Sequence, residues 1–229
     1  MYRKILAAAV VAISVAGAPA AVYEGLTYST TAVKTGVWSS QFTKCKEYAD
    51  SKGVPLVVVW VNPGCGYCAR LCRSLGSSST FAKWVKSSGF IFVLGVGTNN
   101  SSGQSVYRFA HDASGLFPFC AVYLNPIGSV SPIRKKTFNG RNLSADDFRA
   151  KIKSILKNYV KITLKATTGG TVKQMRYQKV GKKITLKATP KKKYKFFGWY
   201  LNGKKVSTKA SYKINVKKAA TYTAKFKKK

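Results

Sequence analysis

The sequence predicts an α/β domain with the element order αβαβαββα, followed by a small all-β domain. Continuous β-branched runs separated by segments of helical period indicate the first domain, and alternating polar and apolar residues after residue 159 indicate the second. The charges divide the chain in the same way, because all six acidic residues precede residue 150, whereas residues 160–229 hold 22 Lys and Arg and no acid. An apolar fraction of 45% is enough for a core and excludes a disordered basic chain.

The N-terminal segment has the pattern of a secretory signal peptide over residues 1–20. A positive stretch, residues 1–4, precedes the apolar residues 5–16, and the segment ends in the small residues Ala-Pro-Ala. We therefore expect cleavage at that end, a linker over residues 21–37, and an exported or envelope-associated protein. An uncleaved anchor is the alternative, because the apolar run continues to Val22 and reaches the lower limit of a membrane-spanning length.

The first domain is expected to occupy residues 38–159. Apolar residues at helical spacing predict helices over 38–51, 104–112 and 144–158, and an interrupted helix over 65–75 and 81–86. Apolar β-branched runs predict strands over 54–61, 89–96, 119–124 and 130–138. Ser144 is a good N-cap for the last helix, and two Asp residues follow in its first turn, where the helix dipole favours acids.

The motif Cys-Gly-Tyr-Cys, residues 65–68, lies where a predicted buried strand passes into a helix. Cysteines at this spacing can form a small disulfide ring, and the positive end of a helix lowers the pKa of the first thiol. Its thiolate attacks disulfides, and the second thiol, one turn deeper, resolves the mixed disulfide. Such a motif also occurs in zinc sites, but its place between a strand and a helix favours redox chemistry.

Residues 32–158 resemble the thioredoxin family. The resemblance rests on the buried strand 56–61, on the Cys-Gly-Tyr-Cys motif, and on the segment Leu-Phe-Pro-Phe at 116–119, which opens a later strand. In that family a cis-proline lies at this strand start, beside the cysteine pair, and the neighbouring backbone docks the substrate chain. The resemblance therefore implies a thioredoxin-like fold and disulfide exchange.

Taken residue by residue, the resemblance makes Cys65 the nucleophile, Cys68 the resolving thiol and Pro118 the cis-proline. The residues that it places against the substrate are Gly66, Tyr67 and Phe117. Val59 stands where reductases of the family have a buried Asp, and Gly64 stands where they often have Trp, which favours an extracytoplasmic oxidant or isomerase. No cofactor beyond the Cys65–Cys68 disulfide is implied, and no metal.

Three cysteines and the one histidine lie outside the motif. Cys45, Cys72 and Cys120 are expected to pack in the core, because free cysteine behaves as a small apolar residue. Two of these three cysteines could form a structural disulfide, and the sequence does not determine which two. His111 is expected to be a polar residue near a helix end. A zinc site on the motif would need two of these four side chains as further ligands.

Residues 160–229 have the pattern of one small β domain. The sequence Ile-Thr-Leu-Lys-Ala-Thr occurs twice, at 162–167 and 184–189, which predicts two strands of one sheet, and Asn-Gly at 202–203 predicts a hairpin turn. The aromatic residues expected in its core are Phe196, Phe197, Trp199, Tyr200 and Tyr212.

This segment resembles the divergent β-repeat module of bacterial cell-surface proteins, which is related to internalin B-type repeats. The residues that carry the resemblance are 169–172, 188–190, 194–200, 202–203 and 221–226. The resemblance implies a role in spacing or adhesion.

The basic residues of the whole chain are 33 Lys and only 8 Arg. Lys is a hydrated point charge, so the net charge of +35 predicts diffuse attraction to polyanions and excludes sequence-specific base recognition. We expect binding to anionic cell-envelope polymers, anionic lipids or non-specific nucleic acid. Thiol- or disulfide-containing proteins are the expected substrates, and membrane insertion is expected only with an uncleaved signal segment.

Two functions from different classes fit these features. The first is an exported thiol–disulfide oxidoreductase that acts through Cys65 and Cys68 and is held near the cell envelope by the cationic β domain. The second is a structural or adhesive protein of a surface or virion assembly, in which the α/β domain is only a scaffold. The redox behaviour of the two cysteines separates these functions.

Overall fold

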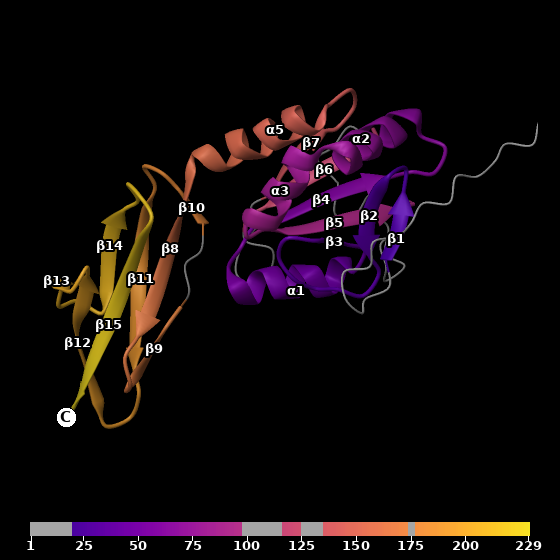
Figure 1. Cartoon of the computed structure of the whole chain (residues 1–229). Coiled ribbons are helices and arrows are strands. Elements are labelled where there is room, and N and C mark those ends of the chain that lie inside the picture. Colours follow the sequence, from indigo (N-terminus) through magenta and orange to yellow (C-terminus); the bar gives the residue numbers. More distant parts are fainter. Residues whose placement is uncertain (1–19, 98–115, 125–134, 174–176) are drawn as a thin grey trace, which may run out of the picture. The chain divides into compact units, whose positions relative to one another are not determined.

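The computed structural model has a mixed α/β region followed by an all-β region (Figure 1). It describes residues 20–97, 116–124, 135–173 and 177–229. The predicted signal peptide up to residue 19, the helix expected at 104–112 and His111 lie outside the described residues. Contacts divide the chain into two compact units, one drawn from residues 1–48, 56–121 and 137–146 and the other from residues 49–55, 122–136 and 147–229. Among the described residues, no helix combines the length and the apolarity needed to cross a membrane.

A seven-stranded sheet forms the centre of the α/β region, with the strand order β1-β2-β3-β5-β4-β6-β7. Its strands are β1 Ala20–Tyr23, β2 Leu26–Ser29, β3 Trp38–Ser39, β4 Leu56–Val61, β5 Ile91–Val96, β6 Phe119–Tyr123 and β7 Lys135–Asn139. Strands β4 and β5 pair in parallel along their whole length. Every residue of β4 is buried, which explains its unbroken apolar sequence, since such strands are covered on both faces.

Helices cover both faces of this sheet, with α1 on one side and α2 and α3 on the other (Figure 1). Their bounds are α1 Phe42–Lys52, α2 Gly66–Ser77 and α3 Ser79–Ser87, and a later helix, α5, spans Ala145–Lys157. Phe42 of α1 packs on Trp60 of β4, with ring centroids 5.4 Å apart. Ser78 caps α3 by accepting the N–H of Phe81 at 3.1 Å. The described residues therefore confirm a mixed α/β region, whereas the complete order αβαβαββα includes a helix that lies outside them.

The chain before α1 differs from the predicted linker and helix start. Residues 20–29 form the hairpin β1-β2, in which Tyr23 pairs with Leu26 across a two-residue turn. Leu26 is buried, and β2 pairs in parallel with β3, so the hairpin extends the sheet. Trp38 belongs to β3 rather than to a helix, because its ring packs on Phe92 of β5 at 5.2 Å. Burial of these apolar side chains against the sheet explains both differences.

The β region consists of two sheets with the strand orders β10-β8-β15-β12-β13 and β14-β11-β9. Its strands are β8 Tyr159–Ala166, β9 Gly170–Val172, β10 Tyr177–Lys179, β11 Lys183–Pro190, β12 Tyr194–Leu201, β13 Lys204–Ser207, β14 Ser211–Asn215 and β15 Ala220–Lys228. The two copies of the repeated sequence lie in β8 and β11, in different sheets, so the expectation of one sheet was wrong. Their Ile and Leu residues meet in one shared core, which explains the common pattern.

The aromatic residues of β12 divide between the core and the surface. Trp199 is fully buried, and its Nε1–H donates to the carbonyl of Ala210 at 3.2 Å. Phe196 and Tyr212 pack against the same core. Phe197 and Tyr200 were wrongly expected there. Phe197 is 37% exposed and its ring stacks with that of Tyr200, because a bulge in β12 between Phe196 and Gly198 alters the alternation of side chains.

Candidate functional site

The Cys65–Cys68 pair lies at the start of α2, directly after the buried strand β4. Cys65 is the N-cap residue of α2, with extended backbone angles, and its sulfur accepts the N–H of Cys68 at 3.2 Å. The N–H of Cys65 in turn donates to the carbonyl of Asn62 at 3.1 Å. The local sequence therefore fixes the first sulfur at the positive end of the helix dipole.

The two sulfurs of this pair form a disulfide, but their surroundings differ. The Cα atoms of Cys65 and Cys68 are 5.2 Å apart, a spacing that is usual for a bonded pair. Cys65 is partly exposed, whereas Cys68 is fully buried together with Leu71, one turn further along α2. The first cysteine of the pair is therefore more accessible to solvent than the second.

The Phe117–Pro118 peptide bond is cis, which is the isomer that the family resemblance implied. The carbonyl of Pro118 accepts the N–H of Gly140 at 2.9 Å. A Cβ at Gly140 would lie 2.8 Å from Cδ2 of Leu71, 2.9 Å from the Sγ of Cys120 and 3.1 Å from Cγ of Pro118. Glycine at this position therefore lets the turn after β7 pack against both the proline segment and α2.

Two arginines flank the ring of Tyr67, the residue before Cys68. The guanidinium carbon of Arg141 lies 3.7 Å from the ring centroid, and that of Arg70 lies 4.5 Å from it. Arg141 is held by the turn after β7, where its backbone N–H donates to Oδ1 of Asn139 at 2.7 Å. Arg141 was missed by the sequence analysis because it reaches the motif only through the fold. The two guanidinium groups make the surroundings of the disulfide electropositive.

The N-terminal hairpin also supports this site. The hydroxyl of Tyr23 donates to the carbonyl of Asn62 at 3.2 Å, in the segment that leads to the disulfide. Glu24, in the hairpin turn, forms an exposed ion pair with Arg73 of α2 at 3.1 Å. The segment predicted to be a linker therefore contacts both the loop that precedes Cys65 and the helix that follows it.

The remaining cysteines are buried and unbonded, as expected for core residues. Burial raises the pKa of Cys72 to about 12, and the charge of Glu24 adds to the increase. Burial likewise raises the pKa of the Cys120 thiol well above its usual value, with Cys72 adding to the increase. Burial also raises the pKa of Cys45, against a hydrogen bond with Ser39 that lowers it. All three thiols are therefore protonated at neutral pH and have little nucleophilic character.

The other predicted site residues lie beside these groups. Gly66 is the first residue of α2 and is exposed, and Phe117 is half-buried at the cis bond. Pro118 lies near α2, because Gly140 packs closely against both Pro118 and Leu71 of α2. Within the described residues, no three His, Cys, Asp or Glu side chains gather into a possible metal site.

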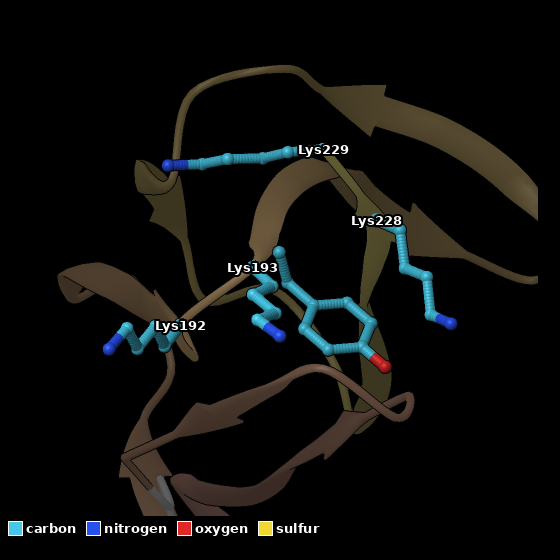
Figure 2. Close-up of a pocket in the computed structure, with 5 residues that line it drawn as sticks. Lys192, Lys193, Lys228 and Lys229 are labelled. Carbon is cyan, nitrogen blue, oxygen red and sulfur yellow. The ribbon is translucent and has the colours of Figure 1, made fainter.

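A second feature is a lysine-lined hollow of about 550 Å³ in the β region (Figure 2). Its lining residues are Lys192, Lys193, Tyr194, Lys228 and Lys229. They come from the turn before β12 and from the end of β15, which the backbone bond from Lys229 N–H to the Lys193 carbonyl holds together at 3.0 Å. Figure 2 shows the ammonium groups of Lys192 and Lys228 extending in different directions. The hollow therefore offers a broad positive surface rather than several donors aimed at one anion.

Comparison with known proteins identifies the C-terminal segment. Residues 160–229 match the family model of the divergent InlB B-repeat domain, a module typical of bacterial surface proteins. A solved structure described as the J-Trx1 fragment of ERdj5 is a weak structural neighbour, with 17% sequence identity and a TM-score of 0.33 over 48% of this chain. The chain covers 47% of that solved chain, about half of its length. No curated protein sequence matches this one.

Proposed function

We propose that this protein is an exported thiol–disulfide oxidoreductase with a thioredoxin-like domain over residues 38–159. The observation that carries the proposal is the difference between the two bonded sulfurs. Cys65 is partly exposed and accepts an N–H of the first turn of α2, whereas Cys68 is fully buried. After reduction, the helix N-terminus and the nearby guanidinium groups favour the thiolate of Cys65 over that of Cys68.

The reaction is a two-electron exchange between this disulfide and a substrate dithiol. A substrate thiolate attacks the Sγ of Cys65, the Cys65–Cys68 bond breaks, and its electron pair leaves on the Sγ of Cys68, which takes up a proton. The second substrate thiolate then attacks the substrate sulfur of the mixed disulfide. A substrate disulfide forms and Cys65 leaves as a thiolate. The reverse sequence reduces a substrate disulfide, and the two reduction potentials decide the direction.

The residues around the disulfide would bind the substrate chain. Phe117 and Pro118 directly precede β6, next to the turn that packs on α2, and Gly66 and Tyr67 directly follow Cys65. We assign the substrate backbone to the proline segment and the substrate side chains to the ring of Tyr67.

The β region would act as the envelope anchor of this enzyme. Its 22 basic residues and lack of acids, together with the lysine-lined hollow, support attraction to anionic envelope polymers or lipids. The match to a module typical of surface proteins supports an extracytoplasmic place. In this proposal residues 1–20 are the signal peptide and residues 160–229 are the anchoring domain.

Titration of the purified protein against glutathione buffers tests the redox proposal. We expect a measurable dithiol potential, loss of exchange activity in Cys65→Ser, and accumulation of mixed disulfides on Cys65 in Cys68→Ala. Cys72→Ala is the matched control, because Cys72 lies one turn further along α2 and is also buried, and it should leave exchange intact. If the protein shows no such potential and Cys65→Ser changes nothing, the enzyme proposal fails.

The same failure would favour the second candidate function. The match of residues 160–229 to the divergent InlB B-repeat domain also supports a structural or adhesive surface protein with the α/β region as a scaffold. Such a protein would keep its polyanion binding when both cysteines are replaced by Ser.

A further inference from the structure

We propose that the outer face of the five-stranded sheet binds single-stranded nucleic acid, with Phe197 and Tyr200 stacking on its bases. We define the outer face as the side chains on the side of this sheet away from the core. Those that carry the proposal are Lys195, Phe197, Tyr200, Lys205, Lys225 and Lys227. The proposal is independent of the redox chemistry at Cys65.

The aromatic pair exists because of the bulge in β12. Pairing with β15 passes from Phe196–Phe226 to Gly198–Lys225, so Phe197 is an extra residue without an opposite partner. A regular strand would place Phe197 and Tyr200 on opposite faces, but the extra residue brings both to the outer face. Their ring centroids are 6.4 Å apart and the rings are inclined by only 23°. Two nearly parallel rings therefore stand at the surface, and Phe197 is 37% exposed.

Three exposed lysines from the two neighbouring strands surround these rings. The ammonium nitrogen lies 3.8 Å from the Phe197 centroid for Lys205, 4.7 Å from it for Lys227, and 4.1 Å from the Tyr200 centroid for Lys225. The stem of Lys205 crosses the bulge directly, because a Cβ on Gly198 would lie 3.2 Å from its Cδ and Cε. Cation–π attraction thus holds ammonium groups at both rings.

This arrangement suits a ligand that has both planar rings and repeated negative charges. Bases can replace the ammonium groups at the ring faces, and the displaced lysines can then contact the phosphates on either side. Residues 160–229 contain no acid that would compete for those lysines. A single strand exposes its base faces, whereas a duplex covers them and a polyol phosphate has none. The aromatic pair therefore favours single strands over other polyanions.

Fluorescence anisotropy of the full-length protein with a labelled oligothymidylate tests this proposal. We expect F197A/Y200A to weaken binding by about tenfold or more, since stacking contributes about 1–3 kcal/mol per base, without changing the salt dependence. The affinity for inorganic polyphosphate should stay unchanged in the same variant. F197L/Y200L should weaken binding in the same way as F197A/Y200A, because leucine keeps apolar bulk but has no ring face. Unaltered hydrogen exchange of the Trp199 amide would show that the fold is intact.

A matched triple of lysines separates stacking from general charge. K205Q/K225Q/K227Q should weaken oligothymidylate binding and make its salt dependence shallower, since each phosphate contact contributes about 0.7 to the log–log slope for single strands. The control K183Q/K187Q/K213Q removes the same charge from the three-stranded sheet, where these exposed residues lie on the neighbouring strands β11 and β14. It should weaken binding less.

Two results would overturn the proposal. One is equal loss of binding from both lysine triples with no effect of F197A/Y200A, which would leave only diffuse attraction to polyanions. The other is equal affinity for the single strand and for a duplex of the same length. Neither result bears on the exchange activity of Cys65, so failure here is distinguishable from failure of the redox proposal.

Discussion

The start of α2 and the outer face of the five-stranded sheet are both electropositive, but they differ in how far each side chain's role depends on its exact place in the fold. At α2, two residues of the same type have different surroundings, because Cys65 is partly exposed and Cys68 is fully buried. On the sheet, Lys205, Lys225 and Lys227 are all exposed and surround the same two rings. A single substitution should therefore abolish function at the first site, whereas losses at the second should be graded.

The largest expected effect concerns thiol reactivity in the reduced protein. Burial raises the pKa of Cys72 to about 12 and also raises that of Cys120, so their thiolates are scarce at neutral pH. Iodoacetamide at about pH 7 should modify Cys65 faster than Cys72 by about a thousandfold or more. Peptide mapping by mass spectrometry measures the rates. Similar modification rates for Cys65 and Cys72 would show that burial does not protect Cys72 from reaction.

The same pKa increase fixes the sign of a pH effect on stability. A thiol with a raised pKa favours the folded state while it is protonated, and this contribution is complete below the ordinary pKa of 9.0. It is lost as the pH rises from there towards 12. We expect Cys72→Ala to flatten this alkaline decrease in unfolding free energy, as measured by urea denaturation of the reduced protein.

A third prediction contrasts two aromatic residues of β12. Trp199→Ala should cost about 3–5 kcal/mol in the stability of the β region, because it removes a fully buried side chain from the core. Phe197→Ala should cost about 1 kcal/mol or less, because that ring lies on the surface. Hydrogen exchange of the β11 and β12 amides measures both. Equal losses of stability from the two substitutions would mean that the Phe197 ring stabilises the fold as much as the buried Trp199 does.

A fourth prediction tests how closely the proline segment and α2 are packed. Gly140→Ala should cost about 1–3 kcal/mol, because the new Cβ would overlap Leu71 and Cys120. It should also slow disulfide exchange, since Arg141 would be displaced from Tyr67. Gly66→Ala is the stability control, because the nearest atom to its new Cβ is Arg70 Nη1 at 3.9 Å. Denaturant titration measures the stability of both variants. Equal stabilities of Gly140→Ala and Gly66→Ala would contradict this prediction.

The smallest effect is expected for the ion pair between the hairpin and α2. Glu24→Gln removes the partner of Arg73, but both side chains are largely exposed, at 41% and 64%. Such pairs contribute about 1 kcal/mol or less. A larger loss of thermal stability would show that the hairpin does more for the redox site than its packing explains.

The Cys65–Cys68 motif and the cis-proline of the candidate site could be located from sequence because their signals are local. The apolar run of β4, the cysteine spacing and the proline at the start of β6 each occupy a few consecutive residues. Arg141 could not be found in this way, since it reaches Tyr67 only when the turn after β7 packs against α2. A turn sequence Asn-Gly-Arg directly after a strand was the one available signal.

The errors of prediction have physical causes in particular segments. The hairpin β1-β2 was hidden because its first residues continue the apolar run assigned to the signal peptide. The outward position of Phe197 was missed because a bulge shifts the alternation by one residue, and the glycine at position 198 inside the strand was the available signal. The two copies of the repeated sequence lie in different sheets but have the same pattern, since each turns its Ile and Leu side chains into one shared core.

The position of β15 has a consequence for how this chain is made. β15 lies between β8 and β12 and pairs with both. The five-stranded sheet therefore stays divided until residues 220–228 have been synthesised, when β8, already paired with β10, gains its second partner more than 50 residues further along the chain. Such distant pairing is slow. The β region consequently completes its five-stranded sheet only when β15 is available to join the two halves.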